Sequence, residues 1–255
     1  MESKIFLQTV YIPRENIFFL EEWLNYHTNL GVDEFWLYDN SGSKYLDFVG
    51  NLEINGKDRH GNLVSEKTKN LSDVEILDLE KKIFDKFNVK KIIWQPRDTK
   101  NNITYNQIGA IYDFKEKVGN GVCCFIDIDE FIFLNNYYNI KHYVSDVLKP
   151  NLDAIQILQK RYLTRWSNPK NVLSISKTFE INTKFWAPKF IGKIEHIKKI
   201  PNRNIHNFFE NFLTEEYFCY FKHFNHNINV HNWLLMNYKS IDSLWIPKTF
   251  DKVFD

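Results

Sequence analysis

Residues 122–126 (VCCFI) are apolar at every position, and Asp127, Asp129 and Glu130 follow at once. A short run of this kind, entered from a Gly-Asn-Gly turn at 119–121, is typical of a strand that is buried on both faces. Such strands form the centre of parallel sheets, and ligands bind these sheets beyond the carboxyl ends of the strands. The run therefore predicts a central parallel strand with carboxylates at the ligand-binding edge.

Strand and helix patterns alternate along the chain before this run. Apolar residues recur at steps of three and four from Glu15 onward, and Gly31 stands where a helix C-cap glycine belongs. We expect strands at 5–11, 34–38, 89–94 and 122–126, and helices at 15–30, 74–87 and 103–118. This alternation predicts an α/β fold with an open, mainly parallel sheet that carries helices on both faces.

The alternation weakens after about residue 136. Short strands are expected near 155–158, 177–185 and 190–194, separated by polar stretches rich in Asn and His. We therefore expect two parts of one domain. Residues 1–135 form its first half, and residues 136–255 form a smaller α+β lobe that completes the same site.

The composition excludes several classes of protein. With 33 Lys and Arg against 32 Asp and Glu, the chain lacks the basic surplus of a nucleic-acid-binding protein. Its 44% of hydrophobic residues excludes a disordered chain. The three cysteines are an odd number, and two of them are adjacent, which favours a reducing compartment. No run reaches the roughly 20 apolar residues of a membrane span, so we expect a cytoplasmic protein that is at most attached to a membrane surface.

Asp127 and Asp129 form a D-x-D sequence. In an extended chain this spacing puts both carboxylates on the same side. Two carboxylates can hold a hard divalent cation, and Mg²⁺ or Mn²⁺ keeps open coordination positions for the phosphate oxygens of a substrate. The alternative is a solvated acidic turn after a strand, but the wholly apolar strand before it favours the metal site.

Asp39 ends the second expected strand. In nucleotide-binding α/β folds an acidic residue at this place commonly binds a ribose hydroxyl or a base edge. The alternative is that Asp39 and Asn40 only form a turn. Residues 8–16 contain no glycine, so neither a dinucleotide fingerprint nor a P-loop is present. Any diphosphate must then be neutralised by the metal and by basic side chains.

Two segments of the chain resemble the glycosyltransferase family 92-like proteins and their relatives in the family 2-like superfamily. They are ENIFFLEEWLNYHTNLGVDEFWLYDNSGS at 15–43 and FIDIDEFIFL at 125–134. The matching positions are Leu20, Glu22, Trp23, Tyr26, His27, Gly31, Val32, Phe35, Tyr38, Asp39, Asn40 and Ser41, followed by Asp127, Asp129, Glu130 and Phe131. The resemblance covers roughly residues 5–135. It implies a GT-A fold, a donor that is most often a UDP-sugar, and Mn²⁺ or Mg²⁺ as cofactor.

The resemblance also implies roles for individual residues. The family's Asn-Glu pair stands here as Glu15 and Asn16, and residues 193–206 with 223–224 are loosely similar to later family segments, including His206. The candidates for donor binding are therefore Tyr11, Glu15, Asn16, Asp39, Asp127 and Lys193. The candidates for metal binding are Asp127, Asp129 and His223, of which His223 also belongs to a histidine cluster with His226 and His231.

An inverting transfer needs a carboxylate base near the acceptor hydroxyl. Glycosyltransferases of the GT-A fold often carry this base well past the D-x-D sequence, in a helix that lines the acceptor pocket. Glu215 and Glu216 stand at such a place and are the candidate catalytic residues, with Glu180 and Asp153 as alternatives.

Residues 184–203 hold six lysines and arginines against Glu195 alone. This segment is interpreted either as a solvated face or as a basic wall. A basic wall would bind the donor diphosphate, an anionic acceptor or an anionic membrane.

The expected function is metal-dependent transfer of a hexose, such as galactose, from a UDP-sugar to a glycan or a lipid-linked sugar. Synthesis of a surface polysaccharide or glycoconjugate, on the inner face of the membrane, would use such an activity. One alternative is a sugar-nucleotide or glycan-binding module with an inactive site. Another is an aspartyl-nucleophile phosphotransferase, although such enzymes usually carry their D-x-D sequence near the N-terminus.

Overall fold

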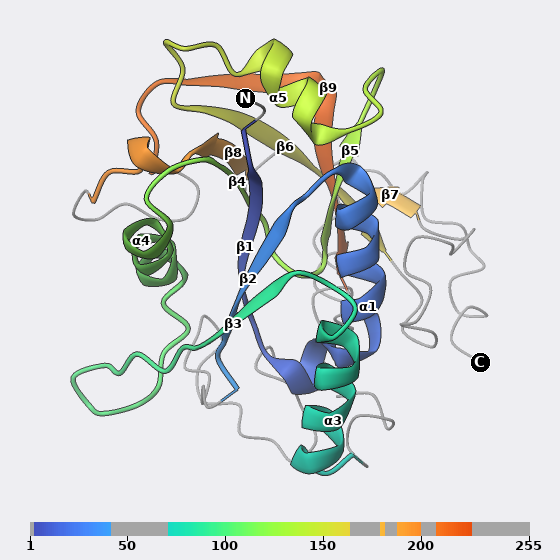
Figure 1. Cartoon of the computed structure of the whole chain (residues 1–255), viewed down its shortest axis with the longest axis vertical. Coiled ribbons are helices and arrows are strands. Elements are labelled where there is room, and N and C mark those ends of the chain that lie inside the picture. The colour runs from blue at the N-terminus through green and yellow to red at the C-terminus, as the bar shows by residue number, and fades with distance from the viewer. Residues whose placement is uncertain (1–2, 42–70, 164–178, 182–187, 200–207, 226–255) are drawn as a thin grey trace, which may run out of the picture.

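A computed structural model describes residues 3–41, 71–163, 179–181, 188–199 and 208–225 (Figure 1). The first half of the chain alternates strands and helices as the sequence predicts. Its elements are β1 (Ile5–Tyr11), α1 (Pro13–Leu30), β2 (Glu34–Asp39), α3 (Asp73–Phe84), β3 (Val89–Ile93), α4 (Gln107–Val118) and β4 (Val122–Phe125). Helix α1 ends at Gly31, whose φ of 107° is the left-handed conformation that a C-cap requires. Helix α4 begins later than predicted because Asn106 caps it, accepting a hydrogen bond from the Gly109 amide.

The chain after β4 supplies further strands and one more α-helix. Its described elements are β5 (Glu130–Leu134), α5 (Ile140–Val147), β6 (Ala154–Leu163), β7 (Phe179–Ile181), β8 (Lys189–Lys193), the 3-10 helix η2 (Ile194–His196) and β9 (Phe212–Asn225). Strands β6, β7 and β8 lie where the sequence predicts strands, whereas β5, α5 and β9 were not predicted.

All the described strands belong to one sheet. Their order is β3-β2-β1-β4-β8-β6-β9-β5, and β7 pairs with β6. Strands β3, β2, β1 and β4 are parallel neighbours, and β6 and β9 run in the same direction as them. Strands β5, β7 and β8 run in the opposite direction. The sheet is therefore mixed but mostly parallel, and it joins strands from both halves of the chain.

Helices cover both faces of this sheet. Helices α1, α3 and α5 contribute to one hydrophobic cluster, which includes Trp23, Ile83 and Tyr143. Helix α4 contributes to a second cluster, in which Phe114 packs against Phe125, and Phe190 packs against Phe208 and Phe209. Figure 1 shows α4 on one side of β1–β3 and α1 with α3 on the other. The prediction of an α/β fold with helices on both faces is confirmed.

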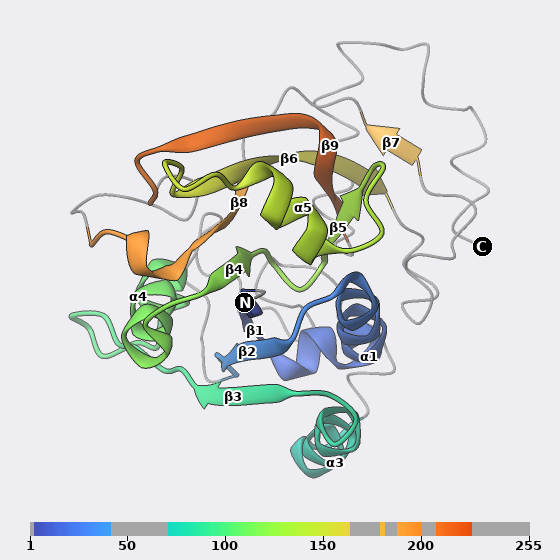
Figure 2. The same cartoon turned by 45° about the horizontal axis from the view of Figure 1, so that its top comes forward.

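The sheet curls, so that its far edge returns to α1. Figure 2 shows β3, β2, β1 and β4 one above the other, with β8, β6 and β9 arching over them. The edge strand β5 then lies against α1: the Trp23 indole donates to the Glu130 carbonyl (2.8 Å), and the Tyr26 hydroxyl donates to the Ile132 carbonyl (2.6 Å). The Ile132 amide donates to Nε2 of His27 (3.4 Å). Residues of the first motif segment thus hold the strand that follows the D-x-D sequence.

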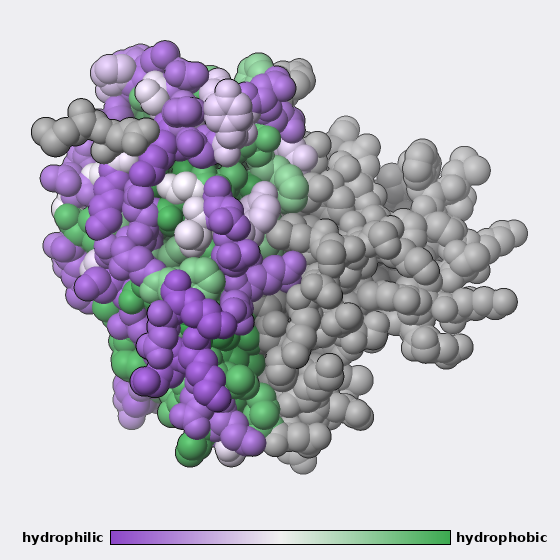
Figure 3. Space-filling view, turned by 45° about the vertical axis from the view of Figure 1, so that its right-hand side comes forward, coloured by the Kyte–Doolittle hydropathy of each residue, from purple (hydrophilic) through white to green (hydrophobic). Residues whose placement is uncertain are grey.

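Hydrophilic residues predominate over the described part of the face in Figure 3. Large exposed apolar side chains within the described residues include Val74 and Leu77 of α3. None of the helices described by the structure is both long enough and apolar enough to cross a membrane.

Candidate functional site

Strand β1 lies at a switch point of the sheet. The chain proceeds from β1 to β2 and β3 on one side of β1, then returns to place β4 on its other side. Open α/β sheets bind ligands outside the carboxyl ends of the strands at such a point. The carboxyl end of β4 leads directly into the D-x-D sequence, so the two aspartates lie where this rule places a ligand.

The D-x-D sequence forms a turn. The Glu130 amide donates to the Asp127 carbonyl (3.0 Å), and the Asp127 amide donates to Oε2 of Glu130 (2.8 Å). Ile128 is buried and anchors the turn in the core, while Asp127 and Asp129 are half-buried. The expectation of an extended D-x-D segment is therefore wrong, because the chain reverses direction here to begin β5.

Lys189, the first residue of β8, places a buried ammonium among these carboxylates. Its Nζ lies 2.8 Å from Oδ2 of Asp127 and 3.5 Å from Oε2 of Glu130. Burial alone would lower the pKa of Lys189, but Asp127 and Glu130, with a smaller contribution from Asp129, outweigh burial and hold the pKa above its usual range. Lys189 is therefore a permanent cation at the D-x-D turn.

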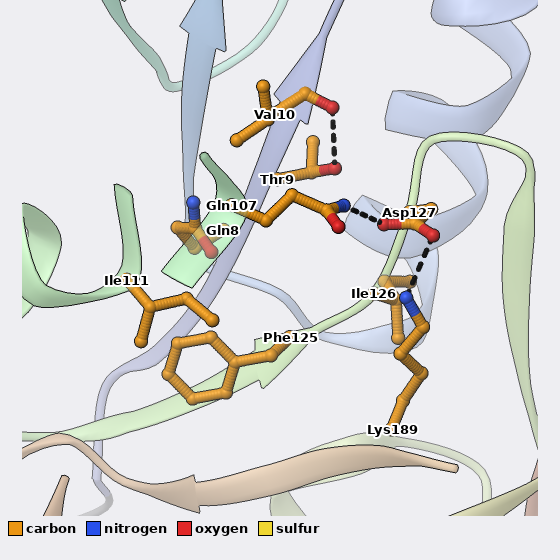
Figure 4. A pocket seen from close by; sticks show the side chains of 9 residues that line it. All are labelled: Gln8, Thr9, Val10, Gln107, Ile111, Phe125, Ile126, Asp127 and Lys189. Carbon is orange, nitrogen blue, oxygen red and sulfur yellow. Dashed lines mark hydrogen bonds and ion pairs between the residues drawn. The ribbon is translucent and has the colours of Figure 1, made fainter. Parts of the chain in front are cut away.

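A small pocket, partly open to solvent, lies beside this ion pair. Figure 4 shows the Gln107 amide from α4 and the Lys189 ammonium approaching Asp127 from two sides. The Gln107 amide donates to Oδ1 of Asp127 (2.7 Å). The amide nitrogen of Gln8, a pocket-lining residue that is 3% exposed, has no hydrogen-bond partner among the described residues. A buried donor without an acceptor is costly, and since this nitrogen is closed off from solvent, a buried water is the partner that suits it.

Asp39 and Tyr11 are brought together, but in a closed network on the other face of the sheet. Lys91 of β3 lies 2.9 Å from Oδ2 of Asp39 and also pairs with Glu80 of α3, which accepts a hydrogen bond from the Tyr11 hydroxyl. The Ser41 amide donates to Oδ1 of Asp39 (2.9 Å). Burial and the neighbouring Glu80 raise the pKa of Tyr11. The Asp39 carboxylate is therefore engaged by the protein instead of being presented to a ligand.

The other residues expected to bind the donor are placed differently. The Asn16 side chain accepts a hydrogen bond from the Ile12 amide (2.9 Å) at the start of α1. Glu15 lies in the first turn of α1, but its side chain is outside the described part. Val122 pairs with Lys193 at the opposite end of β4 from the D-x-D turn. There the Lys193 ammonium donates to the carbonyls of residues 149, 150 and 152, so the structure does not bring Lys193 to the site.

The segment 184–203 does not form a single basic wall. Lys189 is buried at the D-x-D turn, and Lys193 binds backbone carbonyls. The exposed ammonium groups of Lys198 and Lys199 pair with Glu210 and Glu116 respectively. The prediction of a continuous basic surface is wrong for these described lysines, because each one has its own acceptor. Lys184, Arg203 and His206 lie outside the described residues.

Glu215 lies on β9 and not on a helix. Its carboxylate accepts hydrogen bonds from the Tyr143 hydroxyl of α5 (3.5 Å) and from the Phe218 amide (3.1 Å). The pairing of β6 with β9 shifts register directly after Glu215, so residues 216–219 form a bulge. The side chains of Glu216 and of Glu180 are outside the described part.

The alternative base Asp153 lies at the amino end of β6, the edge of the sheet opposite the D-x-D turn. It accepts a hydrogen bond from the Asn211 amide (3.0 Å) and pairs with Nδ1 of His196 (2.6 Å). Both contacts are within the fold, so Asp153 serves as a structural link between β6, η2 and the start of β9.

His223 is placed by the backbone of β9. It pairs with Glu130 in the β5–β9 register, directly after the D-x-D turn. Its side chain lies outside the described part, as do residues 226 and 231. Within the residues that the structure describes, no group of three or more His, Cys, Asp or Glu side chains is arranged to hold a metal ion.

Three residues of this site were not identified from the sequence. From the sequence, Lys189 was treated as one lysine of a basic segment. The one local signal that distinguishes it from the exposed lysines nearby is that it begins an apolar strand. Gln107 and Gln8 carry no motif; the sheet and α4 bring them to the pocket from distant positions.

No known protein-family model matches the chain, and no curated protein matches it significantly. The functional assignment therefore depends on the residues and the geometry of the site.

Proposed function

We propose that this chain is a metal-dependent glycosyltransferase of the GT-A type, which transfers a hexose from a UDP-sugar to a glycan or a lipid-linked sugar. The observation that carries this proposal is the D-x-D turn at the carboxyl end of β4, beside the switch point of the sheet. Nucleotides bind open α/β sheets at this place. A pocket lined by the Lys189 ammonium lies next to the turn, and a cation at this place suits an anionic ligand.

The charges at the turn fit a divalent ion. Asp127, Asp129 and Glu130 carry three negative charges and Lys189 carries one positive charge, so the net charge of the group is −2. Carboxylate oxygens are the ligands that Mg²⁺ and Mn²⁺ prefer. Asp127 and Asp129 would hold the ion, with His223 as a further ligand because its backbone pairs with Glu130. The ion would supply positive charge that stabilises the departing UDP.

The residues of the chain have separate roles in this proposal. Lys189 takes the diphosphate role that the sequence suggested for Lys193. Glu15 and Asn16 lie at the amino end of α1, directly beyond the carboxyl end of β1, and are the proposed contacts to the nucleoside. Tyr11 and Asp39 act indirectly, by fixing the ends of β1 and β2 through Glu80 and Lys91.

The proposed general base is on β9. Glu215 already accepts hydrogen bonds from Tyr143 and from the Phe218 amide, which indicates a structural role. Glu216, in the adjoining bulge, is therefore the better candidate to deprotonate the acceptor hydroxyl.

A thermal-shift panel tests donor binding. Purified protein is heated with UDP-, GDP- and CDP-sugars, each with Mn²⁺ or with EDTA. Because a ligand that binds only the folded state stabilises it by mass action, UDP-sugars with Mn²⁺ should raise the melting temperature most. Release of UDP from the best donor then separates an enzyme from an inactive binding module, which would be stabilised without turnover.

A further inference from the structure

Lys189 differs from an ordinary ion-paired lysine in its position. It is 3% exposed, and β8 brings it to the D-x-D turn through the pairing of Phe190 with Phe125, the last residue of β4. Its ammonium contacts Asp127 from one side while the Gln107 amide contacts the same carboxylate from the other (Figure 4). The Asp127 carboxylate is thereby fixed in orientation before any ligand arrives.

The same ammonium belongs to the lining of the pocket beside the D-x-D turn. Lys189 and Asp127 both line the pocket, together with the buried amide of Gln8 that lacks an acceptor among the described residues. An anion bound in this pocket would lie close to the fixed positive charge of Lys189. Charge-assisted hydrogen bonds of this kind are stronger than neutral ones.

We propose, on the basis of the function proposed above, that Lys189 is a built-in cation of the donor site, which orients Asp127 and shares the neutralisation of the diphosphate with one divalent ion. Two consequences follow. Part of the affinity for UDP does not require the metal, because the ammonium is permanent. The ammonium also weakens metal binding to the empty site, because it repels a second cation close to the same carboxylates.

Four variants separate this role from a purely structural ion pair. Lys189→Met removes the charge and keeps an unbranched chain, and Lys189→Arg keeps the charge. Lys189→Met combined with Glu130→Gln removes one charge of each sign, which leaves the net charge at −2 and protects the fold if Lys189→Met alone fails to fold. Lys4→Met is the matched control, since Lys4 also forms an ion pair, with Glu34 at the opposite end of the sheet (2.6 Å).

Two equilibrium measurements are made on each variant: Mn²⁺ affinity by electron paramagnetic resonance, without nucleotide, and UDP affinity by calorimetry, in EDTA and in saturating Mn²⁺. Lys189→Met should bind Mn²⁺ about tenfold more tightly, because one repelling charge is lost. It should bind UDP about tenfold more weakly in EDTA, with a smaller loss in Mn²⁺. The double variant should return Mn²⁺ affinity to the wild-type value and keep the loss of UDP affinity, and Lys189→Arg and Lys4→Met should change neither.

The proposal would be overturned if a folded Lys189→Met protein kept the wild-type affinities for Mn²⁺ and UDP. It would also be overturned if the double variant kept the wild-type affinity for UDP. Either result would leave Lys189 as a structural ion pair. Failure of the proposed function gives a different result: the wild-type protein itself would bind no UDP in either condition. The Mn²⁺ titration needs no nucleotide, so it would still decide whether Lys189 acts as a cation at the D-x-D turn.

Discussion

The Asp127 carboxylate has both oxygens held by the fold, Oδ1 by Gln107 and Oδ2 by Lys189. Asp129 lies two residues further along the same turn and is half-buried. The backbone of the turn is closed by hydrogen bonds between Asp127 and Glu130, in which the Asp129 side chain takes no part. A substitution at position 129 therefore leaves the groups that make these two hydrogen bonds in place.

Asp129→Ala should abolish sugar transfer and leave the fold intact. We expect turnover to fall by at least about a hundredfold, the scale of a lost electrostatic contact to a developing charge. The melting temperature should stay close to the wild-type value. Asp146→Ala, which removes an exposed aspartate of α5, is the control and should retain full activity. Near wild-type transfer by Asp129→Ala would show that the D-x-D turn is not the site.

Asp39→Asn should lower stability more than it changes donor binding. The substitution removes the charge of a buried carboxylate that pairs with the half-buried Lys91 ammonium, and losing such a charged hydrogen bond costs about 2 kcal/mol, while Lys91 keeps Glu80 as its partner. Urea unfolding measures this loss, and the double variant with Lys91→Met should recover part of it. A raised Michaelis constant for the donor with unchanged unfolding would instead support the ribose contact that the resemblance implies.

At the level of elements, α1 acts as a clamp on β5. Trp23, Tyr26 and His27 contact backbone groups of β5, so the two motif segments, far apart in the sequence, meet in the structure. Nδ1 of His27 lies 2.9 Å from the Trp23 carbonyl while Nε2 accepts from Ile132, which describes a neutral imidazole. These residues hold the strand that follows the D-x-D turn in place.

The clamp predicts a pH dependence. Burial lowers the pKa of His27 to about 3, from an ordinary value near 6.5. Between these pH values the unfolded state binds a proton that the folded state does not, so the free energy of unfolding falls as the pH falls below 6.5. One such proton contributes at most about 1.4 kcal/mol per pH unit. Urea unfolding at several pH values should show a shallower slope for His27→Gln, and an unchanged slope would contradict the buried neutral imidazole.

Replacing the two exposed lysines that follow η2 should have only a small effect on stability and binding. Lys198 and Lys199 each pair with a glutamate on the surface, and such pairs contribute roughly 0–1 kcal/mol. Replacing both with Gln should leave UDP affinity unchanged and should hardly reduce binding to vesicles that contain anionic lipid. Sedimentation with such vesicles checks this, and a strong loss of binding would restore the membrane role expected from the sequence.

At the level of the whole molecule, the sequence pattern correctly predicted those strands and helices whose formation depends on neighbouring residues. Strand β1 was predicted with its bounds, α1 was predicted with its cap at Gly31, and the strand predicted at 122–126 is the central strand β4, which ends one residue earlier at Phe125. Strand β9 was missed because its sequence is polar at many positions and only its pairing with β6 and β5 makes it a strand. The places of Lys189 and Lys193 could not be predicted for the same reason. The two side chains are chemically the same, and only the β4–β8 register decides which one reaches the D-x-D turn.

The sheet also explains why the site draws on both halves of the chain. Asp127 follows β4, Lys189 begins β8, Gln107 begins α4 and Gln8 lies on β1, so four distant segments meet at one pocket. Strand β8 inserts between β4 and β6, and in doing so it carries the cation of the second half to the carboxylates of the first.

Release of UDP from UDP-hexoses in Mn²⁺, compared between the wild-type protein and Asp129→Ala, tests the central claim most directly. Chromatography of the nucleotides, with and without a sugar acceptor, measures the release. We expect the wild-type protein to release UDP from at least one UDP-hexose, faster with an acceptor and not in EDTA, and we expect Asp129→Ala to release almost none. Equal release by both proteins, or no release and no UDP binding by the wild-type protein, would contradict a glycosyltransferase site at the D-x-D turn.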